Sequence, residues 1–137
     1  MSVVTELIRT EQDGTLSFGN FELDKKSKLS DYIYEGDSYK VKTFVEITKL
    51  ERNGMFVYES VPGTSVHGFR VTDDGMDFMV YGYKDSQITV GLEESTAYHV
   101  TIDGINVGQI KTNVGGKLVV NAELKDGVAS IISIEKV

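Results

Sequence analysis

The chain of 137 residues contains no cysteine, no tryptophan and a single proline. Without cysteine there is no disulfide, no thiolate nucleophile and no cysteine-ligated zinc. Residues 1–11 lack the basic start and continuous apolar run of a signal peptide. No apolar stretch approaches the length of about 20 residues that a membrane-spanning helix needs. These absences predict a soluble, cytoplasmic chain without membrane insertion, and they leave open another export route or assembly at a cell surface or virion.

Acidic residues outnumber basic ones by 21 to 14, which gives a formal net charge of -7. Nucleic acid and anionic membranes both require basic surface, so neither is expected as a partner. The sequence has one local basic cluster, Lys25, Lys26 and Lys28, next to Asp24 and Asp31. This mixture of signs favours a solvated loop.

Turn-forming dipeptides recur along the whole chain and separate short runs rich in β-branched and aromatic residues. They are Asp13-Gly14, Gly36-Asp37, Asn53-Gly54, Asp74-Gly75, Asp103-Gly104, Gly115-Gly116 and Asp126-Gly127. Such dipeptides are typical of β-hairpins, and no segment shows a helical period. The sequence therefore predicts an all-β fold of antiparallel hairpins.

Turn chemistry and apolar spacing together predict which residues face each other in five hairpins. The predicted pairs near the C-terminus are Ile102 with Ile105, Val100 with Val107, Leu124 with Val128, Val120 with Ile132, and Leu118 with Ile134. The predicted pairs nearer the N-terminus are Ile8 with Phe18, Tyr34 with Tyr39, Tyr32 with Val41, Val71 with Phe78, and Phe69 with Val80.

The only proline lies in Val61-Pro62-Gly63-Thr64. This segment is the best candidate for a domain border or for a major crossover between strands. The first alternative predicts a small N-terminal β domain over residues 1–61 and an Ig-like β-sandwich over residues 64–137. The second segment has about seven strand candidates, the density expected of an Ig-like sandwich.

No set of residues carries a catalytic or cofactor signature. His67 and His99 lie on different predicted strands, and the serines lack the context of a nucleophile elbow. Asp73, Asp74 and Asp77 contain carboxylates that suit calcium but lack the spacing of an EF-hand, so calcium binding stays open. The sequence therefore predicts a protein that is not an enzyme and has no cofactor or metal site.

Tyrosines at alternating positions, Tyr32 with Tyr34 and Tyr81 with Tyr83, could form flat surfaces on a sheet. Three interpretations remain open: packing inside the molecule, a protein interface, or stacking against a glycan. The predicted binding surface lies on one face of the hairpin around Asp74-Gly75. It consists of Arg70, Met79, Tyr81 and Tyr83.

The segments Tyr98-His-Val-Thr-Ile-Asp-Gly-Ile-Asn-Val-Gly108, Lys111-Thr-Asn113 and Gly116-Lys-Leu118 resemble the closing hairpins of Ig-like modules of bacterial surface and carbohydrate-active proteins. The whole chain is similar to small bacterial proteins sometimes labelled endosialidase, with Leu50-Glu-Arg-Asn-Gly54 and Phe56-Val-Tyr-Glu-Ser60 among the similar segments. Known sialidases have a six-bladed propeller and Asp-box repeats ending in tryptophan. This chain is shorter and has no tryptophan, so the resemblance implies no catalytic residue.

Taken together, these patterns predict a structural or interaction protein that self-associates or docks a protein partner through β-sheet surfaces. The alternative is a β-sandwich module that binds a carbohydrate or another ligand. A homo-oligomer or a protein partner is expected in the first case and a glycan in the second.

Overall fold

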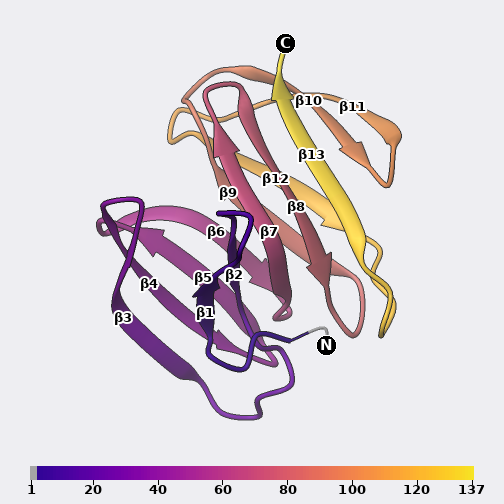
Figure 1. The fold of residues 1–137 in the computed structure, drawn as a ribbon. Helices are drawn as coiled ribbons and strands as arrows, with labels where there is room; N and C mark the ends of the chain where they lie inside the picture. The colour runs from indigo at the N-terminus through magenta and orange to yellow at the C-terminus, as the bar shows by residue number, and fades with distance from the viewer. Residues whose placement is uncertain (1–2) are drawn as a thin grey trace.

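The computed structural model describes residues 3–137, which form thirteen β-strands and no helix, so no helix there could cross a membrane. The larger sheet contains, in spatial order, β1 (Ile8–Thr10), β2 (Leu16–Phe18), β7 (Ser65–Thr72), β8 (Gly75–Tyr81), β13 (Ser130–Lys136), β10 (Ala97–Ile102) and β11 (Ile105–Lys111). The smaller sheet contains β12 (Lys117–Ala122), β9 (Ser86–Gly91), β6 (Met55–Val61), β5 (Ile47–Arg52), β4 (Asp37–Phe44) and β3 (Ser27–Tyr34). Neighbouring strands run antiparallel throughout (Figure 1), which confirms the all-β prediction.

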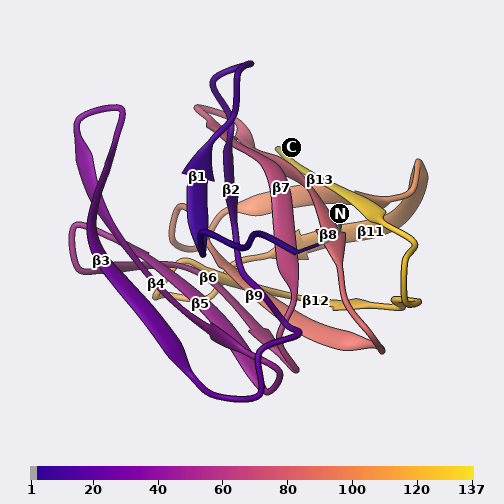
Figure 2. The same ribbon diagram turned by 60° about the horizontal axis from the view of Figure 1, so that its bottom comes forward.

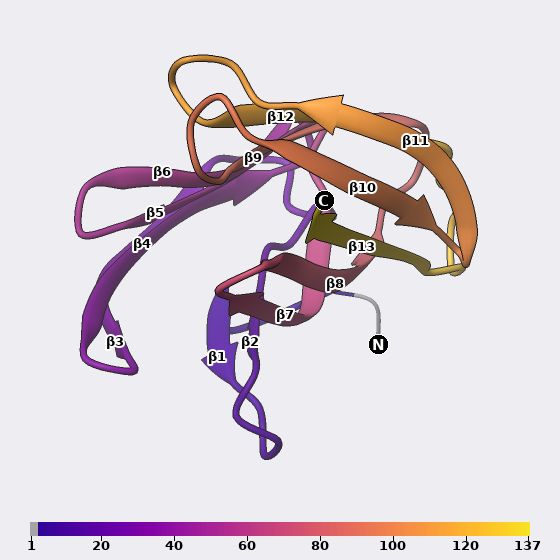
Figure 3. The same cartoon turned by 90° about the horizontal axis from the view of Figure 1, so that it is seen from above.

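The two sheets form two layers that bury their facing side chains between them (Figure 3). Aromatic rings at the centre meet edge to face, with centroid distances of 5.2 Å for Phe18 and Tyr58, 5.5 Å for Phe18 and Phe69, and 5.7 Å for Tyr58 and Phe78. These rings come from β2, β6, β7 and β8, so both sheets contribute to one core. The architecture is a two-sheet antiparallel sandwich.

The predicted border between residues 61 and 64 does not separate two sheets or two cores. β2 pairs with β7 in the larger sheet, and β6 pairs with β9 in the smaller one, so both sheets contain strands from each side of that border. Pro62 lies where the chain leaves β6 in one sheet and enters β7 in the other. Of the two alternatives for this segment, the structure shows the crossover.

Three short hairpins have the predicted local geometry. Ile8 faces Phe18 and Ile102 faces Ile105, as expected from the turns between them. At Asn53-Gly54 both residues have positive φ angles, 51° and 79°, the conformation of a tight hairpin turn. At these three turns, the local sequence was sufficient to predict the turn geometry.

The predicted closing hairpin of residues 118–134 is wrong. β12 pairs with β9 in the smaller sheet, whereas β13 lies between β8 and β10 in the larger sheet. Leu118, Val120, Ile132 and Ile134 are all buried, as expected, but they belong to opposite layers of the core. Alternating apolar residues predict which side chains are buried and not which strand lies beside them.

Other predicted registers are wrong because a turn lies at another position than expected or because a strand contains a bulge. Val100 faces Gly108 instead of Val107, next to a bulge between Val100 and Thr101. The turn after β3 is Glu35-Gly36, so Tyr32 faces Tyr39 and Tyr34 faces Asp37. In the β7–β8 hairpin, Val71 faces Met76 and Val66 faces Val80, with a bulge between His67 and Arg70.

Gly75 explains why the last of these turns is displaced. A Cβ atom on this residue would overlap the carbonyl oxygen of Ile134 on the neighbouring strand, so only glycine fits at this position. Gly75 is therefore the first residue of β8 and faces Thr72, and Asp73-Asp74 form the turn.

A buried chain of hydroxyl groups fixes the crossover between the sheets. Thr48 Oγ1 donates to the carbonyl oxygen of Thr64 at 2.7 Å and accepts from the Thr64 amide at 3.1 Å. The Thr48 hydroxyl has one proton, which it gives to the Thr64 carbonyl, so in the 2.8 Å bond between Thr43 Oγ1 and Thr48 Oγ1 the Thr43 hydroxyl is the donor. Thr43 Oγ1 in turn accepts a hydrogen bond from the Asn20 amide. The Tyr58 hydroxyl and Ser60 Oγ both lie 2.7 Å from Thr64 Oγ1.

Candidate functional site

The predicted surface residues Arg70, Met79 and Tyr81 lie on the outer face of the larger sheet. Met79 faces His67 on β7 and Ile131 on β13, and the ring of Tyr81 meets that of His67 edge to face at 5.4 Å. Arg70 lies one cross-strand row away, opposite Asp77. The structure thus brings Met79 and Tyr81 together, with Arg70 nearby.

Tyr83 follows the end of β8 and packs differently from the other three. Its ring stacks on that of Phe21, with centroids 6.2 Å apart and planes 17° apart, and Lys84 Nζ lies 5.5 Å from its centre. The ring of Tyr83 therefore already packs against the N-terminal segment on one side. The surface of these four residues stays a prediction.

Tyr32 and Tyr34 join the two sheets along one side of the sandwich. The Tyr32 hydroxyl forms a 2.8 Å hydrogen bond with Thr10 Oγ1 on β1, and the Tyr34 hydroxyl donates to the carbonyl oxygen of Gly14. Burial, more than any charge, raises the pKa of Tyr34. Of the three interpretations of the tyrosines, the structure shows packing inside the molecule for Tyr32 and Tyr34. Their hydrogen bonds connect the two sheets where β3 lies next to β1.

An open groove lies between the two sheets next to these tyrosines. Figure 2 shows the β3–β4 hairpin on this side of the molecule, next to β1. The groove consists of two hollows of about 400 and 460 Å³ that share Arg52 and Val71 in their walls. The first hollow is also lined by Tyr34, Tyr39 and Asp37. Burial raises the pKa of Tyr39, and the nearby positive charge of Arg52 opposes that shift. The groove offers aromatic, cationic and carboxylate groups to a polar ligand.

The serine and threonine hydroxyls of the crossover do not form an accessible reactive site. Ser60, Thr64 and Ser65 are completely buried, and burial raises the pKa of Tyr58 well above its ordinary value. A substrate would have to enter the core to reach any of them. Their geometry is that of a structural network.

The acidic cluster predicted as a possible calcium site is spread over two places. Asp73 and Asp74 form the β7–β8 turn, whereas Asp77 lies on the outer face of β8 opposite Arg70 and Ser133. Within residues 3–137, no group of three or more histidine or acidic side chains has an arrangement that could hold a metal ion.

Sequence reasoning missed two surfaces that depend on strand order. Lys40, Lys42 and Lys49 lie beside Lys28 on the outer face of the smaller sheet. In addition, β11 and β12 are the terminal strands of their sheets and lie on the same side of the molecule (Figure 3). The sequence offers two signals for the first surface: Lys40 and Lys42 alternate on one strand, and Lys28 belongs to the basic cluster that was expected in a loop but lies on β3.

Comparison with known proteins gives no match: no family model, no curated protein and no solved structure is similar to this chain. Its function has to be argued from its own surfaces.

Proposed function

We propose that this chain is a non-enzymatic interaction protein that pairs with a second copy of itself through the edge of the smaller sheet. The observation that carries the proposal is the free edge of β12, which pairs with β9 through six residues without a bulge. The other sheet ends differ: β1 has three residues, and β3 and β11 each contain a register shift. Short or bulged edges resist pairing with further strands, and a regular edge invites it.

The hydrogen bonds near β12 identify its outward backbone groups. The Leu92 amide donates to the Gly116 carbonyl at 2.7 Å, so alternation directs the backbone groups of Leu118 and Val120 toward β9. Those of Val119 and Asn121 then point away from the sheet. Lys117 also points outward, but Asn113 in the preceding loop binds both its amide and its carbonyl.

The free groups define one favourable register for a symmetric pair. Antiparallel pairing centred on Val120 places Val119 opposite Asn121 of the second copy, which allows four hydrogen bonds between backbones. In this register Leu118 lies opposite Ala122 of the second copy, so the side chains that are buried in each copy lie on the same face of the combined sheet. If the register between the two copies shifted by one residue, the buried side chains of one copy would lie opposite solvent-facing side chains of the other. No lysine faces another lysine in this arrangement.

Exposed aliphatic side chains lie on β12, on β11, which is the end strand of the other sheet, and on the loop between them. Val119 is 42% exposed, and Ile105, Val107 and Val114, on β11 and the loop between the two strands, are 68%, 49% and 84% exposed. Exposed aliphatic side chains beside unpaired strand edges are typical of an interface. They support a protein contact on this side of the sandwich.

Light scattering over a hundredfold range of concentration tests the proposal. The wild type should reach twice the mass of 15.1 kDa. Val119→Pro removes the outward N–H without removing a bond to β9, so it should stay folded and monomeric. Val119→Ala keeps that N–H and serves as the matched control that still dimerises. A monomeric wild type, or a dimer that survives Val119→Pro, would overturn the proposal.

The groove between the sheets supports a second candidate, a module that binds a carbohydrate or another polar ligand. Tyr34 and Tyr39 lie 5.7 Å apart with Arg52 and Asp37 along the same wall. Aromatic rings beside charged groups suit sugars, which offer both apolar faces and hydroxyls. An oligosaccharide array probed with wild type, Arg52→Ala and the distant control Lys111→Ala tests it. Binding that only Arg52→Ala abolishes is the expected result, and no binding by wild type excludes this candidate.

A further inference from the structure

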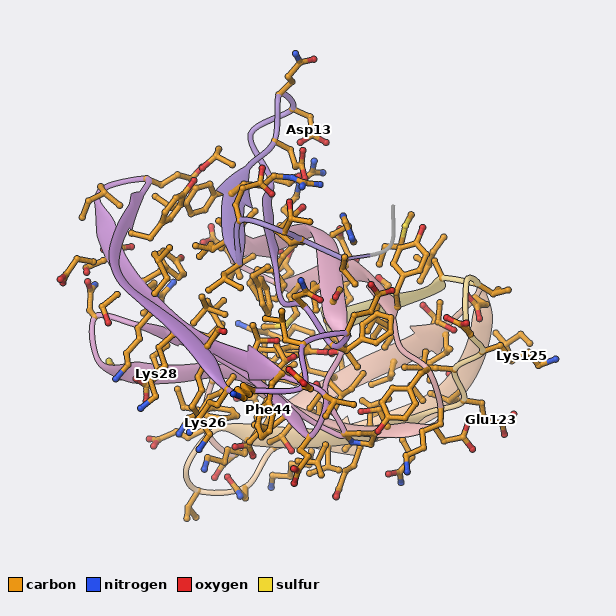
Figure 4. The ribbon with its side chains drawn as sticks, turned by 90° about the horizontal axis from the view of Figure 1, so that it is seen from below. Asp13, Lys26, Lys28, Phe44, Glu123 and Lys125 are labelled. Atoms are coloured by element: carbon orange, nitrogen blue, oxygen red, sulfur yellow. The ribbon has the colours of Figure 1, made fainter. Side chains whose placement is uncertain are left out.

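A row of lysines crosses the outer face of three strands in the smaller sheet. Lys28 on β3 faces Lys42 on β4, and Lys42 faces Lys49 on β5. Neighbouring strands are about 4.8 Å apart, so the three side chains start close together. Figure 4 shows Lys26 and Lys28 on the same part of the molecule, far from Asp13 at the tip of the β1–β2 turn.

The lysines surround a hollow. Its volume is about 190 Å³, and its walls are Lys28, Lys40, Lys42, Lys49 and Glu51. Within the described residues, Lys49 with Glu51, at 3.7 Å, is the only ion pair in these walls. Four ammonium groups therefore share one carboxylate within these walls, and a second carboxylate, that of Glu59 on β6, lies outside them opposite Lys49.

This arrangement disfavours the folded state when nothing is bound. Like charges directly opposite each other on paired strands repel. Partial burial lowers the pKa of Lys42, the charges of Lys26, Lys49 and Lys28 lower it further, and only the charge of Glu59 opposes this shift. General solubility does not explain such a cluster in a chain whose net charge is -7.

We propose that this hollow binds a doubly charged tetrahedral oxyanion, the phosphate or sulfate group of a small ligand, with Lys42 at its centre. Each ammonium group can donate up to three hydrogen bonds, and charge-assisted bonds to such an anion are strong. A bound anion would attract all of these lysines and offset the repulsion between them. Two strands, β9 and β6, separate the site from β12, so it does not depend on the proposed pairing.

Thermal unfolding of the full chain in inorganic phosphate, against sodium chloride of equal ionic strength, tests the proposal. Phosphate should raise the Tm of wild type further than chloride does, and increasingly with concentration. Lys42→Gln should weaken phosphate binding about tenfold. Without phosphate it should have a Tm about 1–4 °C higher than wild type, because the repulsion is relieved. Lys111→Gln, which removes the same charge on β11, should leave the phosphate response unchanged.

Lys28→Gln provides a second variant with the same expectation of a weaker phosphate response. The same measurement with inorganic sulfate and with a sugar phosphate monoester shows whether the free oxyanion or its ester raises the Tm more. Either pattern supports the site. An equal phosphate response in wild type, Lys42→Gln and Lys28→Gln would overturn it. A response only to a long polyanion such as an oligonucleotide would overturn it as well, because it would indicate diffuse attraction.

Discussion

Replacing Thr48 by valine tests the buried hydroxyl chain that fixes the crossover between the sheets. Valine has nearly the shape of threonine, so the change removes one hydroxyl without creating a cavity. Three buried groups lose their partner: the amide of Thr64, its carbonyl, and the hydroxyl proton of Thr43. Each unsatisfied buried group costs about 1–3 kcal/mol, and with some relaxation we expect a total loss of about 2–4 kcal/mol.

Urea unfolding followed by circular dichroism measures this loss as a change in midpoint at constant slope. Thr48→Ser keeps the hydroxyl and loses one methyl group, so it should cost only about 1 kcal/mol. Thr89→Val, on the outer face of β9, where the described structure gives its side chain no hydrogen bond, should change stability by less than about 0.5 kcal/mol. If Thr48→Val unfolds within about 0.5 kcal/mol of wild type, the hydroxyl chain does not stabilise the crossover.

Three further predictions concern other parts of the fold. Burial raises the pKa of Tyr58 above its ordinary 10.0, so the unfolded state ionises first and stability should fall as pH rises above about 10. Tyr58→Phe should flatten this decline in urea titrations between about pH 9 and 11, and an unchanged slope would contradict the assignment. Gly63→Ala should cost about 1–3 kcal/mol in thermal unfolding, because the new Cβ would overlap the carbonyl oxygen of Phe44; a neutral result would show that the crossover can shift. Tyr81→Asp should leave the chain folded and weaken association in light scattering if the predicted outer surface takes part, and unchanged association would exclude that surface.

The two outer faces of the sandwich have different chemistry. The larger sheet presents Met79, Tyr81 and Ile131 next to one another, whereas the smaller sheet presents lysines and the regular edge of β12. The proposed pairing, the proposed oxyanion site and the predicted surface therefore use different residues. Single substitutions can test each of them without disturbing the others.

The sequence by itself determined the strands, several turns and the buried positions. Asn53-Gly54 and the residues around Asp103 form tight hairpins because their positive φ angles depend only on local chemistry. Leu118, Val120, Ile132 and Ile134 are buried because alternating apolar side chains need a covered face whichever strand lies beside them. The absence of a helical period excluded a helical fold in the same way.

Tertiary structure decided which strands pair and which surfaces result. β12 and β13 are close in sequence but belong to different sheets, a displaced turn gives Tyr32 another partner than expected, and a bulge does the same for Val100. The lysine row and the free edge of β12 both follow from that strand order. The physical reason is that strand pairing satisfies backbone groups that are identical in every residue, so only packing of both layers selects the neighbours.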